Sequence, residues 1–347
     1  MTLLRETGLN IRSINLKTYI IAEAGVNHNG DIKLAKEMVF AAKKAGASCI
    51  KFETFVTEEL VTPYASKAQY QKENLKSIDE TQFEMLKKYE LNEAHYFELK
   101  ELCKKEKIDF LSTPFDLESI KILERVDMPV WKIPSGEITN FPYLKRLAET
   151  GKPIFLSTGM TDLSEISWAI NVLGQYGGGN ITLLHCNSQY PTPFNDANLK
   201  SIQTLHDRFN LPVGYSDHTL GIEAAVAAVA LGAVIIEKHF TLDKSQSGPD
   251  HKMSIDEKEL TQLVYMINNV EMALGTGEKK PSESELSTIV IARKSIVASR
   301  DIKKGEIIKE CDIKAKRPGY GISPIYWEDI IGQCAKRNFK ENEMIEV

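Results

Sequence analysis

The chain has 347 residues, of which 42% are hydrophobic and 26% are charged, and its formal net charge is −5. This size and composition are typical of a globular protein that consists of one β/α barrel and a small second domain. The acidic balance and the lack of a basic block argue against nucleic acid or an anionic membrane surface as the main partner.

The N-terminal segment and the cysteines predict the compartment. Residues 1–10 contain no apolar core of the kind found in export signals, and no apolar run approaches the length of a membrane span. The five cysteines form no CxxC pair and have no zinc-like spacing. This pattern indicates reduced thiols, so we expect a cytoplasmic protein that has no membrane partner.

Eight short apolar runs alternate with amphipathic or Ala-rich stretches along most of the chain. This alternation is typical of a parallel sheet covered by helices, and eight units fit a closed (β/α)8 TIM barrel of about 250 residues. An open doubly wound sheet is the alternative, but no GxGxxG follows the first run. Asp162 and Glu165 predict a helix start as a capping pair. The predicted strands are 19–22, 48–52, 108–111, 130–133, 153–156, 181–185, 212–215 and 233–238, and the clearest helices are 31–45, 92–105, 117–126, 164–173 and 220–231.

Two segments depart from this alternation. Residues 54–91 exceed an ordinary βα connection and predict either a loop over the barrel mouth or a helical decoration. Near residue 275 the composition becomes polar and rich in Gly and Pro, which predicts a linker. We therefore expect a TIM-barrel catalytic domain over residues 1–275, a linker over 276–288 and a small β-rich domain over 289–347.

Polar or charged residues follow every predicted strand, at the end where barrel enzymes carry their sites. A lone Ser or Thr at such a position is more often a cap. Caps alone do not explain eight polar strand ends on one rim. Each uncompensated buried charge costs several kcal/mol, so a purely structural barrel has no reason to place so many ionisable groups at one face. These strand ends carry Glu23; Lys51 and Glu53; Ser112 and Thr113; Lys132, Ser135 and Glu137; Ser157 and Thr158; Asn187 and Ser188; Ser216, Asp217 and His218; and Glu237, Lys238 and His239.

One subset of these residues predicts an anion site. Lysines supply point charge and hydroxyls supply directed donors, so the set resembles a cradle for a phosphate and a carboxylate. An isolated Lys at a strand end more often forms a surface salt bridge, but Lys132 lies between apolar residues and needs a partner. In the run KIPSGE, Gly136 allows the backbone to approach an anion closely. The members of this subset are Lys51, Lys132, Ser135, Ser157 and Ser216.

A second subset, His218 and His239, ends two consecutive predicted strands. A lone His is more often structural. Two imidazoles with carboxylates nearby suit a divalent transition metal that keeps open positions for a substrate. Such a metal would act as a Lewis acid on a carbonyl group.

The order and spacing of the motifs resemble the bacterial sialic acid synthase family, from about residue 18 to the C-terminus. That family includes the N-acetylneuraminate, legionaminate and pseudaminate synthases. The resemblance implies a TIM barrel followed by an antifreeze-like SAF domain, in a domain-swapped homodimer. The motifs are AEAGVNHNG (22–30), KFETF (51–55), FLSTPFD (110–116), KIPSGEITN (132–140), LSTGM (156–160), LHCNSQYPTP (184–193), GYSDHTLG (214–221), EKHFTLD (237–243), GPDHKMS (248–254) and KRPGYGISP (316–324).

The resemblance also implies roles for individual residues. His218 and His239 would bind Mn²⁺, or else Mg²⁺ or Co²⁺, and Glu137 would be the acid/base. Arg317 would reach into the partner subunit's site. The residues implied to hold phosphoenolpyruvate are Lys51, Thr113, Lys132, Ser135, Ser157, Asn187, Ser188 and Ser216, and those implied to contact the sugar are Glu23, which would also lie near the metal, Glu53, Tyr190 and Asp250.

The implied reaction joins C3 of phosphoenolpyruvate to the aldehyde carbon of an N-acetyl amino sugar, after which water adds at C2 and phosphate leaves. Several runs look nearest to legionaminate synthases, whose sugar is 2,4-diacetamido-2,4,6-trideoxymannose; N-acetylmannosamine, giving N-acetylneuraminate, is the other sugar considered. Glu53 is a departure, because the family commonly has Gln there, and a carboxylate cannot donate unless it is protonated.

Three alternatives stay open. The chain could be a pseudaminate synthase, or another phosphoenolpyruvate-condensing barrel that takes a phosphorylated sugar and so needs a second phosphate site. A non-enzymatic sugar-binding or antifreeze-like protein is the third. Ice binding calls for a flat and weakly charged surface, whereas residues 289–347 are dense in charged side chains.

Overall fold

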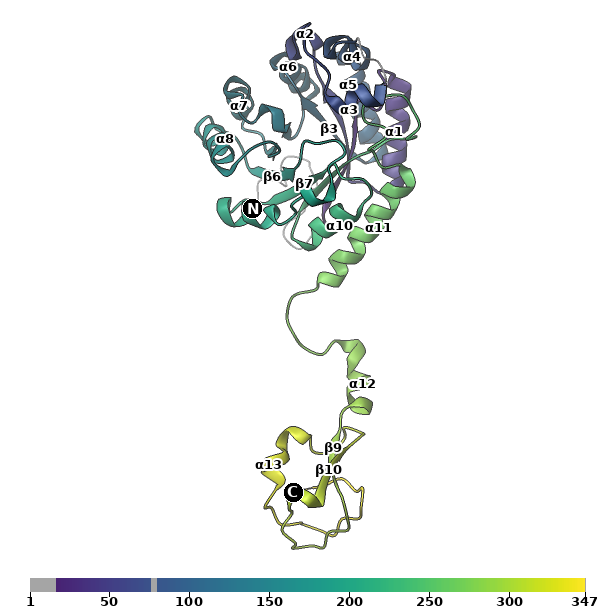
Figure 1. Ribbon diagram of the computed structural model, residues 1–347, viewed down its shortest axis with the longest axis vertical. Helices are drawn as coiled ribbons and strands as arrows, with labels where there is room; N and C mark the ends of the chain where they lie inside the picture. Colours follow the sequence, from purple (N-terminus) through teal and green to yellow (C-terminus); the bar gives the residue numbers. More distant parts are fainter. Residues whose placement is uncertain (1–16, 76–79, 347) are drawn as a thin grey trace. The chain divides into compact units, whose positions relative to one another are not determined.

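The computed structural model describes residues 17–75 and 80–346. The first sixteen residues, which contain the segment predicted to hold no export signal, lie outside the described residues. The chain divides after Gly275 into two compact units, both visible in Figure 1. In the part of the chain that is described, no helix has the length and apolar character needed to cross a membrane.

The first unit contains eight parallel strands that nearly close into a barrel. Their hydrogen-bonded order is β3-β2-β1-β8-β7-β6-β5-β4, so the first and last strands pair, with Tyr19 opposite Ile235. Strands β3 and β4 lie in contact at the seam. The eight predicted strands and the TIM-barrel fold are confirmed. The strands are β1 (Tyr19–Gly25), β2 (Cys49–Thr54), β3 (Asp109–Pro114), β4 (Trp131–Ile133), β5 (Ile154–Ser157), β6 (Ile181–Cys186), β7 (Val213–Asp217) and β8 (Ile235–His239).

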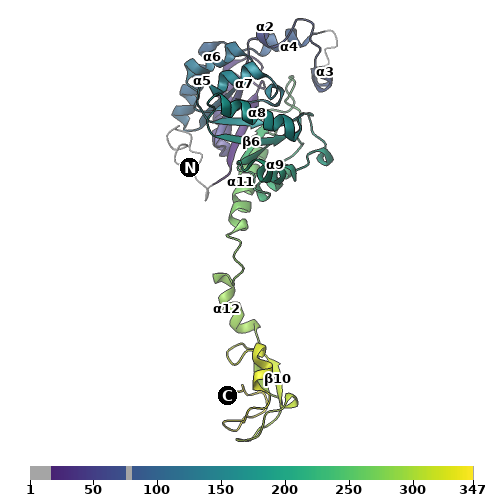
Figure 2. The same cartoon turned by 90° about the vertical axis from the view of Figure 1, so that its left-hand side faces the viewer.

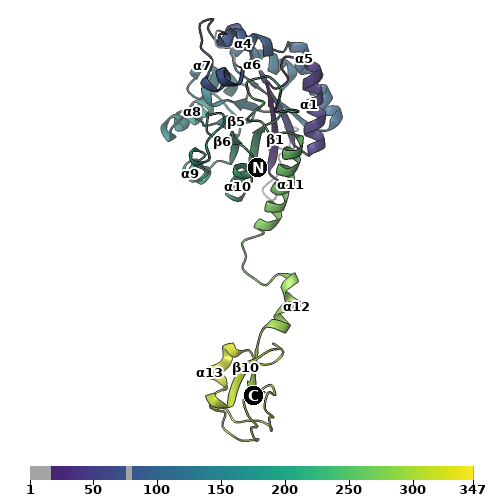
Figure 3. The ribbon, with the colours of Figure 1, turned by 45° about the vertical axis from the view of Figure 1, so that its right-hand side comes forward.

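Helices cover the outside of this barrel, and the five predicted from sequence are confirmed. Helix α1 packs against both α5 and α11 (Figure 3). Asp162 caps α8, and its side chain and that of Glu165 form the predicted reciprocal pair. The covering helices are α1 (Ile32–Ala45), α5 (Glu93–Glu106), α6 (Leu117–Val126), α7 (Phe141–Ala148), α8 (Leu163–Gln175), α9 (Ser201–Phe209), α10 (Glu223–Ala230) and α11 (Glu257–Leu274).

The long segment after β2 is a helical decoration. Of the two structures predicted for it, a loop over the barrel mouth and a helical decoration, the second is observed. It contains α2 (Thr57–Leu60), α3 (Gln69–Leu75) and α4 (Gln82–Tyr89). Helices α2 and α4 lie side by side (Figure 2). Apolar side chains of this insertion and of the β1 and β2 ends form a small core of their own, made of Val26, Phe55, Met85 and Tyr89 with Leu60, Leu75, Leu86 and Phe115 around it.

The second unit is small and rich in bridges between extended segments. Strand β9 (Ser295–Ala298) pairs antiparallel with β10 (Ile313–Lys316), and a short helix, α13 (Trp327–Ile330), follows. Its core is mainly isoleucine, closed by Phe339. Helix α12 (Glu283–Ala292) occupies part of the predicted linker, because Ser282 and Glu285 form a capping box that starts a helix within this polar sequence.

Close packing inside the barrel gives a first prediction. A Cβ added to Gly214 in β7 would lie 2.6 Å from Leu184 Cδ2 and 2.7 Å from Ile235 Cβ. We expect Gly214→Ala to lower the free energy of unfolding by about 1–3 kcal/mol, because the strand must shift. Urea denaturation followed by circular dichroism measures this.

Gly174→Ala is the matched control. Gly174 lies in α8, and its added Cβ would meet nothing within 4 Å among the described residues. The control should gain about 0.5–1 kcal/mol from helix propensity. Equal stability of the two variants would contradict the packing argument.

Candidate active site

Lys51 is buried near the centre of the barrel mouth and is surrounded by acceptors. Its Nζ lies 2.7 Å from Glu23 Oε2 and 3.8 Å from Glu237 Oε2, and it donates to Thr113 Oγ1 at 3.0 Å. Burial alone would lower the pKa of Lys51, but Glu23 and Glu237 raise it above the usual value. Lys51 is therefore a fixed cation at neutral pH.

Glu237 connects this lysine to the second buried one. Its Oε1 accepts from Lys132 Nζ at 3.1 Å and from Ser216 Oγ at 2.9 Å. Burial would raise the pKa of Glu237, but Lys132 and Lys51 outweigh burial and hold the pKa at about 2. Two cations and a permanent anion thus lie together inside the barrel.

The sequence places Glu237 among the polar strand ends but does not indicate its role in the site. A signal was available, because side chains two residues apart in a strand point to the same face. His239 was expected at the rim, so Glu237 had to point into the barrel as well. Only the structure shows that Glu237 meets both Lys51 and Lys132 across the barrel.

Hydroxyl groups gather beside the lysines at the ends of β4, β5 and β6. Ser135 Oγ accepts from the Gly159 N–H at 2.9 Å. A Cβ on Gly159 would lie 2.5 Å from Ser188 Oγ and 2.8 Å from Ser135 Oγ, so these two hydroxyls approach the same point. Ser157 Oγ is buried and has no hydrogen-bond partner in the described part of the chain. The Ser157 hydroxyl can therefore meet an anion without first breaking a hydrogen bond to a described residue.

His218 and His239 lie together at the ends of β7 and β8, with ring centroids 5.4 Å apart. The Nδ1–H of His218 donates to the Asn187 carbonyl at 2.6 Å, which leaves its Nε2 with a free lone pair. The Tyr190 ring lies 4.2 Å from that of His218 and 5.8 Å from that of His239. The structure therefore brings the predicted histidine pair and Tyr190 into one cluster.

The side chains around this pair fit a divalent metal. His239 Nδ1 and Glu23 Oε1 are buried, and neither has a hydrogen-bond partner among the residues described. A Cβ on Gly25 would lie 3.3 Å from Glu23 Oε1 and 3.7 Å from the His239 ring, so both border one small space. Burial lowers the pKa of His218 to about 4 and that of His239 well below its usual value. Neutral imidazoles are the form that binds metal.

The histidine pair is not part of a larger cluster of metal ligands. Within residues 17–75 and 80–346, no group of three or more His, Cys, Asp or Glu side chains is arranged to hold a metal ion. An ion bound by His218 and His239 would therefore keep several positions open, which suits a metal that also binds substrate.

Two predicted site residues, Glu137 and Arg317, have hydrogen-bond partners outside the lysine network and the histidine pair. Glu137 follows β4 and accepts a hydrogen bond from Asn140 Nδ2; burial raises its pKa. Arg317 belongs to the second unit, where its Nε donates to the Ala292 carbonyl at 3.0 Å. The predicted contact of Arg317 with a partner subunit's sugar stays a prediction.

A cavity of about 250 Å³ adjoins the histidine pair. His239, Tyr190, Glu53 and Asp250 line one part of it, and the insertion after β2 lines the rest. Burial, with a smaller contribution from Glu53, raises the pKa of Asp250 to about 7. Asp250 Oδ1 is buried and lacks a hydrogen-bond partner in the portion of the chain described.

The loop that carries Asp250 is fixed by the motif after β1. Asn27 Nδ2 donates to the Phe240 carbonyl at 2.9 Å and to Ser254 Oγ at 2.8 Å. Ser254 Oγ in turn donates to the Asp250 carbonyl at 2.7 Å, and His251 hydrogen bonds to Thr241. Asn27 thus positions Asp250 through Ser254.

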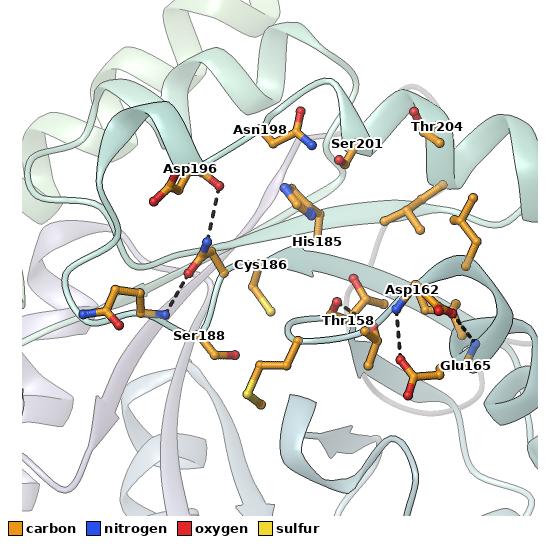
Figure 4. Close-up of a pocket in the computed structure, with 17 residues that line it drawn as sticks. Thr158, Asp162, Glu165, His185, Cys186, Ser188, Asp196, Asn198, Ser201 and Thr204 are labelled. Carbon is orange, nitrogen blue, oxygen red and sulfur yellow. Dashed lines mark hydrogen bonds between the residues drawn. The ribbon is translucent and has the colours of Figure 1, made fainter. Parts of the chain in front are cut away.

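A second and larger cavity, of about 960 Å³, lies between α8 and α9. Figure 4 shows Ser201 and Thr204 on one of its sides and Asp162 and Glu165 on another. It reaches the rim at the ends of β5 and β6, where Thr158, Asn187 and Ser188 line it. None of the buried lysines and neither histidine lines it, so we place the candidate site at the barrel mouth.

Comparisons with known proteins agree with this geometry. Residues 38–279 match the NeuB family, and residues 293–346 match the SAF domain. The chain belongs to the NeuB family. It is 52% identical over 331 residues to the N,N'-diacetyllegionaminic acid synthase of Campylobacter jejuni, and the alignment covers 95% of this chain and 99% of the relative. It is 48% identical over 335 residues to that of Legionella pneumophila, covering 95% and 94%.

A solved structure is similar as well. The N-acetylneuraminic acid synthetase of Leptospira borgpetersenii, crystallised with citrate, is 36% identical and superposes with a TM-score of 0.69, covering 79% of this chain and 91% of that protein. The family resemblance inferred from the motifs is therefore confirmed. Because these relatives are synthases, this NeuB family chain is an enzyme.

The buried charges of this NeuB family member give a second prediction. Glu237→Gln removes the anion that Lys51 and Lys132 share, and we expect the free energy of unfolding to fall by about 3–5 kcal/mol. Urea denaturation at neutral pH measures this.

Glu118→Gln is the control, because Glu118 pairs with Lys121 on the exposed face of α6. It should change stability by less than about 1 kcal/mol. A Glu237→Gln variant as stable as this control would contradict the role given to the network.

Proposed function

We propose that the chain is an N,N'-diacetyllegionaminic acid synthase, an enzyme of the C–C bond-forming transferase type. It condenses phosphoenolpyruvate with 2,4-diacetamido-2,4,6-trideoxymannose and water and releases phosphate. One observation supports this reaction most strongly: Lys51 and Lys132 lie on the same rim of the barrel as the paired imidazoles. The 52% identity with the Campylobacter jejuni enzyme supports the choice of sugar.

The buried lysines and nearby hydroxyls bind phosphoenolpyruvate. Lys51 and Lys132 are held in place before any ligand arrives, so they meet the phosphate and carboxylate with little reorganisation. Thr113 and Ser216 already hydrogen bond within this network. The remaining donors come from Ser135, Ser157, Asn187 and Ser188.

His218 and His239 hold a divalent ion, Mn²⁺ in our proposal, although Mg²⁺ and Co²⁺ fit the same donors. When bound, the ion polarises the aldehyde carbonyl of the open-chain sugar. The Asn187 carbonyl fixes the tautomer of His218, and Glu23 borders the same space.

A carboxylate with a raised pKa supports the proton transfers. Burial raises the pKa of Glu137, which moves it toward the working pH of a general acid or base. The C3–C1 bond forms as the aldehyde oxygen takes a proton. Water adds at C2 with loss of a proton, and the bond between C2 and the phosphate oxygen breaks. Glu137 is our candidate for the acid/base.

Glu53, Tyr190 and Asp250 contact the sugar in this proposal. Arg317 completes the site from the SAF domain of a partner subunit, in a domain-swapped homodimer. The five unpaired cysteines support a reducing, cytoplasmic compartment.

Phosphate release tests the proposed reaction. Chelator-treated enzyme is given phosphoenolpyruvate, Mn²⁺ and either the diacetamido sugar or N-acetylmannosamine. The proposal predicts faster, metal-dependent release with the diacetamido sugar. Faster release with N-acetylmannosamine would make the chain a neuraminate synthase, and no metal-dependent release with either sugar would contradict the reaction.

The metal assignment gives a third prediction. His218→Ala should lower Mn²⁺-dependent turnover by at least about 100-fold, because one of the two protein ligands is lost. Its affinity for phosphoenolpyruvate, measured calorimetrically without metal, should stay within about threefold of the unmodified enzyme.

His206→Ala is the matched control, since His206 lies exposed on α9 and hydrogen bonds to the Leu211 carbonyl. It should turn over normally. Normal turnover by His218→Ala as well would remove the histidine pair from the metal site.

A further inference from the structure

The cavity beside His239 has two chemically different walls. The barrel and its loops contribute polar groups, namely Glu53, Tyr190, His239 and Asp250. The insertion after β2 contributes an apolar wall, and it also contributes Tyr70, Gln71, Gln82 and Tyr89 to the lining. At about 250 Å³ the cavity is below the roughly 300–1,000 Å³ of drug-sized ligand sites, so it suits one end of a small molecule. The apolar wall consists of Leu60, Val61, Met85 and Leu86, with Val26, Phe55 and Phe115 from the adjoining strand ends and loops.

The insertion is fastened to the candidate catalytic residues. The Tyr70 ring of α3 lies 5.2 Å from that of Tyr190, which itself packs on His218. Asn74 Nδ2, also in α3, donates to the Pro249 carbonyl at 2.6 Å, next to Asp250. These contacts hold α3 beside Tyr190 and Asp250, and Leu75 of α3 belongs to the same apolar cluster as Leu60, Met85 and Leu86.

The polar wall calls for a ligand with N–H or O–H donors. Asp250 Oδ1 has no hydrogen-bond partner among the described residues, although the side chain is more than nine-tenths buried. Glu53 supplies a second carboxylate to the same cavity. The unpartnered Oδ1 of Asp250 is a hydrogen-bond acceptor, so the amide N–H of an acetamido group is a suitable partner.

The apolar wall calls for the opposite chemistry. A methyl group in contact with Leu60, Val61 or Met85 would be buried favourably, whereas a hydroxyl at that position would lose its hydrogen bonds to water and find no replacement on these three side chains. Of the hydrogen-bonding groups in the same lining, Gln71 Nε2 already donates to Tyr70 Oη. A ligand that suits both walls carries an acetamido group and a methyl group close together.

We propose that this cavity determines sugar specificity, and that the insertion selects sugars that end in a methyl group at C6 over sugars that end in a hydroxymethyl group. Val61 and Met85 are the residues that make this choice, while Glu53 and Asp250 accept from a neighbouring acetamido N–H. This inference rests on the proposed condensation and adds the position and the physical basis of its selectivity.

Two sugars that differ by one oxygen atom test the proposal. They are 2,4-diacetamido-2,4,6-trideoxymannose and 2,4-diacetamido-2,4-dideoxymannose, which carries a hydroxyl on C6. We expect kcat/KM for phosphate release to favour the 6-deoxy sugar by roughly 10- to 100-fold, the range over which an apolar pocket rejects an added hydroxyl. Equal kcat/KM for the two sugars would overturn the inference and leave the proposed reaction intact. No release with either sugar would overturn both.

Two variants test the residues assigned to the wall. Val61→Thr and Met85→Gln each add a hydrogen-bonding group at nearly constant volume, and each should reduce the preference at least about fivefold, chiefly through better use of the hydroxylated sugar. Tyr64→Ser is the control, because Tyr64 lies in the same insertion with 91% of its surface exposed; its preference should equal that of the unmodified enzyme.

Thermal unfolding separates selectivity from folding. The preference is a ratio for one folded enzyme, so a less stable variant can still be measured below its unfolding temperature. An unchanged preference in folded Val61→Thr and Met85→Gln would contradict the assignment of the apolar wall.

Discussion

The buried ion pairs inside the barrel are the constraint on which the candidate site depends. Lys51 and Lys132 are almost fully removed from water, and such cations are tolerated only beside anions. Glu23 and Glu237 meet that need, with Nζ–O distances of 2.7 Å for Lys51 and Glu23 and 3.1 Å for Lys132 and Glu237. The same pairing raises the pKa of Lys51 and holds both lysines in place in the absence of a ligand. An electrostatically preorganised site of this kind favours binding and release of a charged phosphate group, because little rearrangement is needed at the moment of reaction.

Strand alternation connects this network to the histidine pair. Glu237 and His239 point toward the barrel interior, and Lys238 between them points outward. There Lys238 Nζ lies 2.8 Å from Asp217 Oδ2, and this pair is also buried. Strands β7 and β8 are therefore joined by polar contacts on both faces. Ser216 and Glu237 make the connection inside the barrel, and Asp217 and Lys238 make it outside. This double connection fixes the strand ends that carry the two imidazoles.

The sequence predicted the barrel because its strands are short apolar runs, and the rim because polar residues follow each of them. It could not decide the structure of residues 54–91: α3 has no fully buried residue, so its sequence lacks the periodic pattern that marks a covering helix. The helix that begins at Glu283 was read as linker, since the capping box of Ser282 and Glu285 has the same polar composition as a loop. The apolar wall beside His239 also escaped prediction, because its members come from separate helices and meet only in the folded chain.

The proposed function requires that one rim binds phosphoenolpyruvate through the buried lysines and a metal through the histidine pair. A crystal structure of the enzyme with phosphoenolpyruvate and Mn²⁺ would show both ligands in place. We expect phosphoenolpyruvate oxygens within hydrogen-bond distance of Nζ of Lys51 and Lys132, and Mn²⁺ coordinated by Nε2 of His218 and by His239. Phosphoenolpyruvate bound away from both lysines, or Mn²⁺ bound away from both histidines, would contradict the proposal.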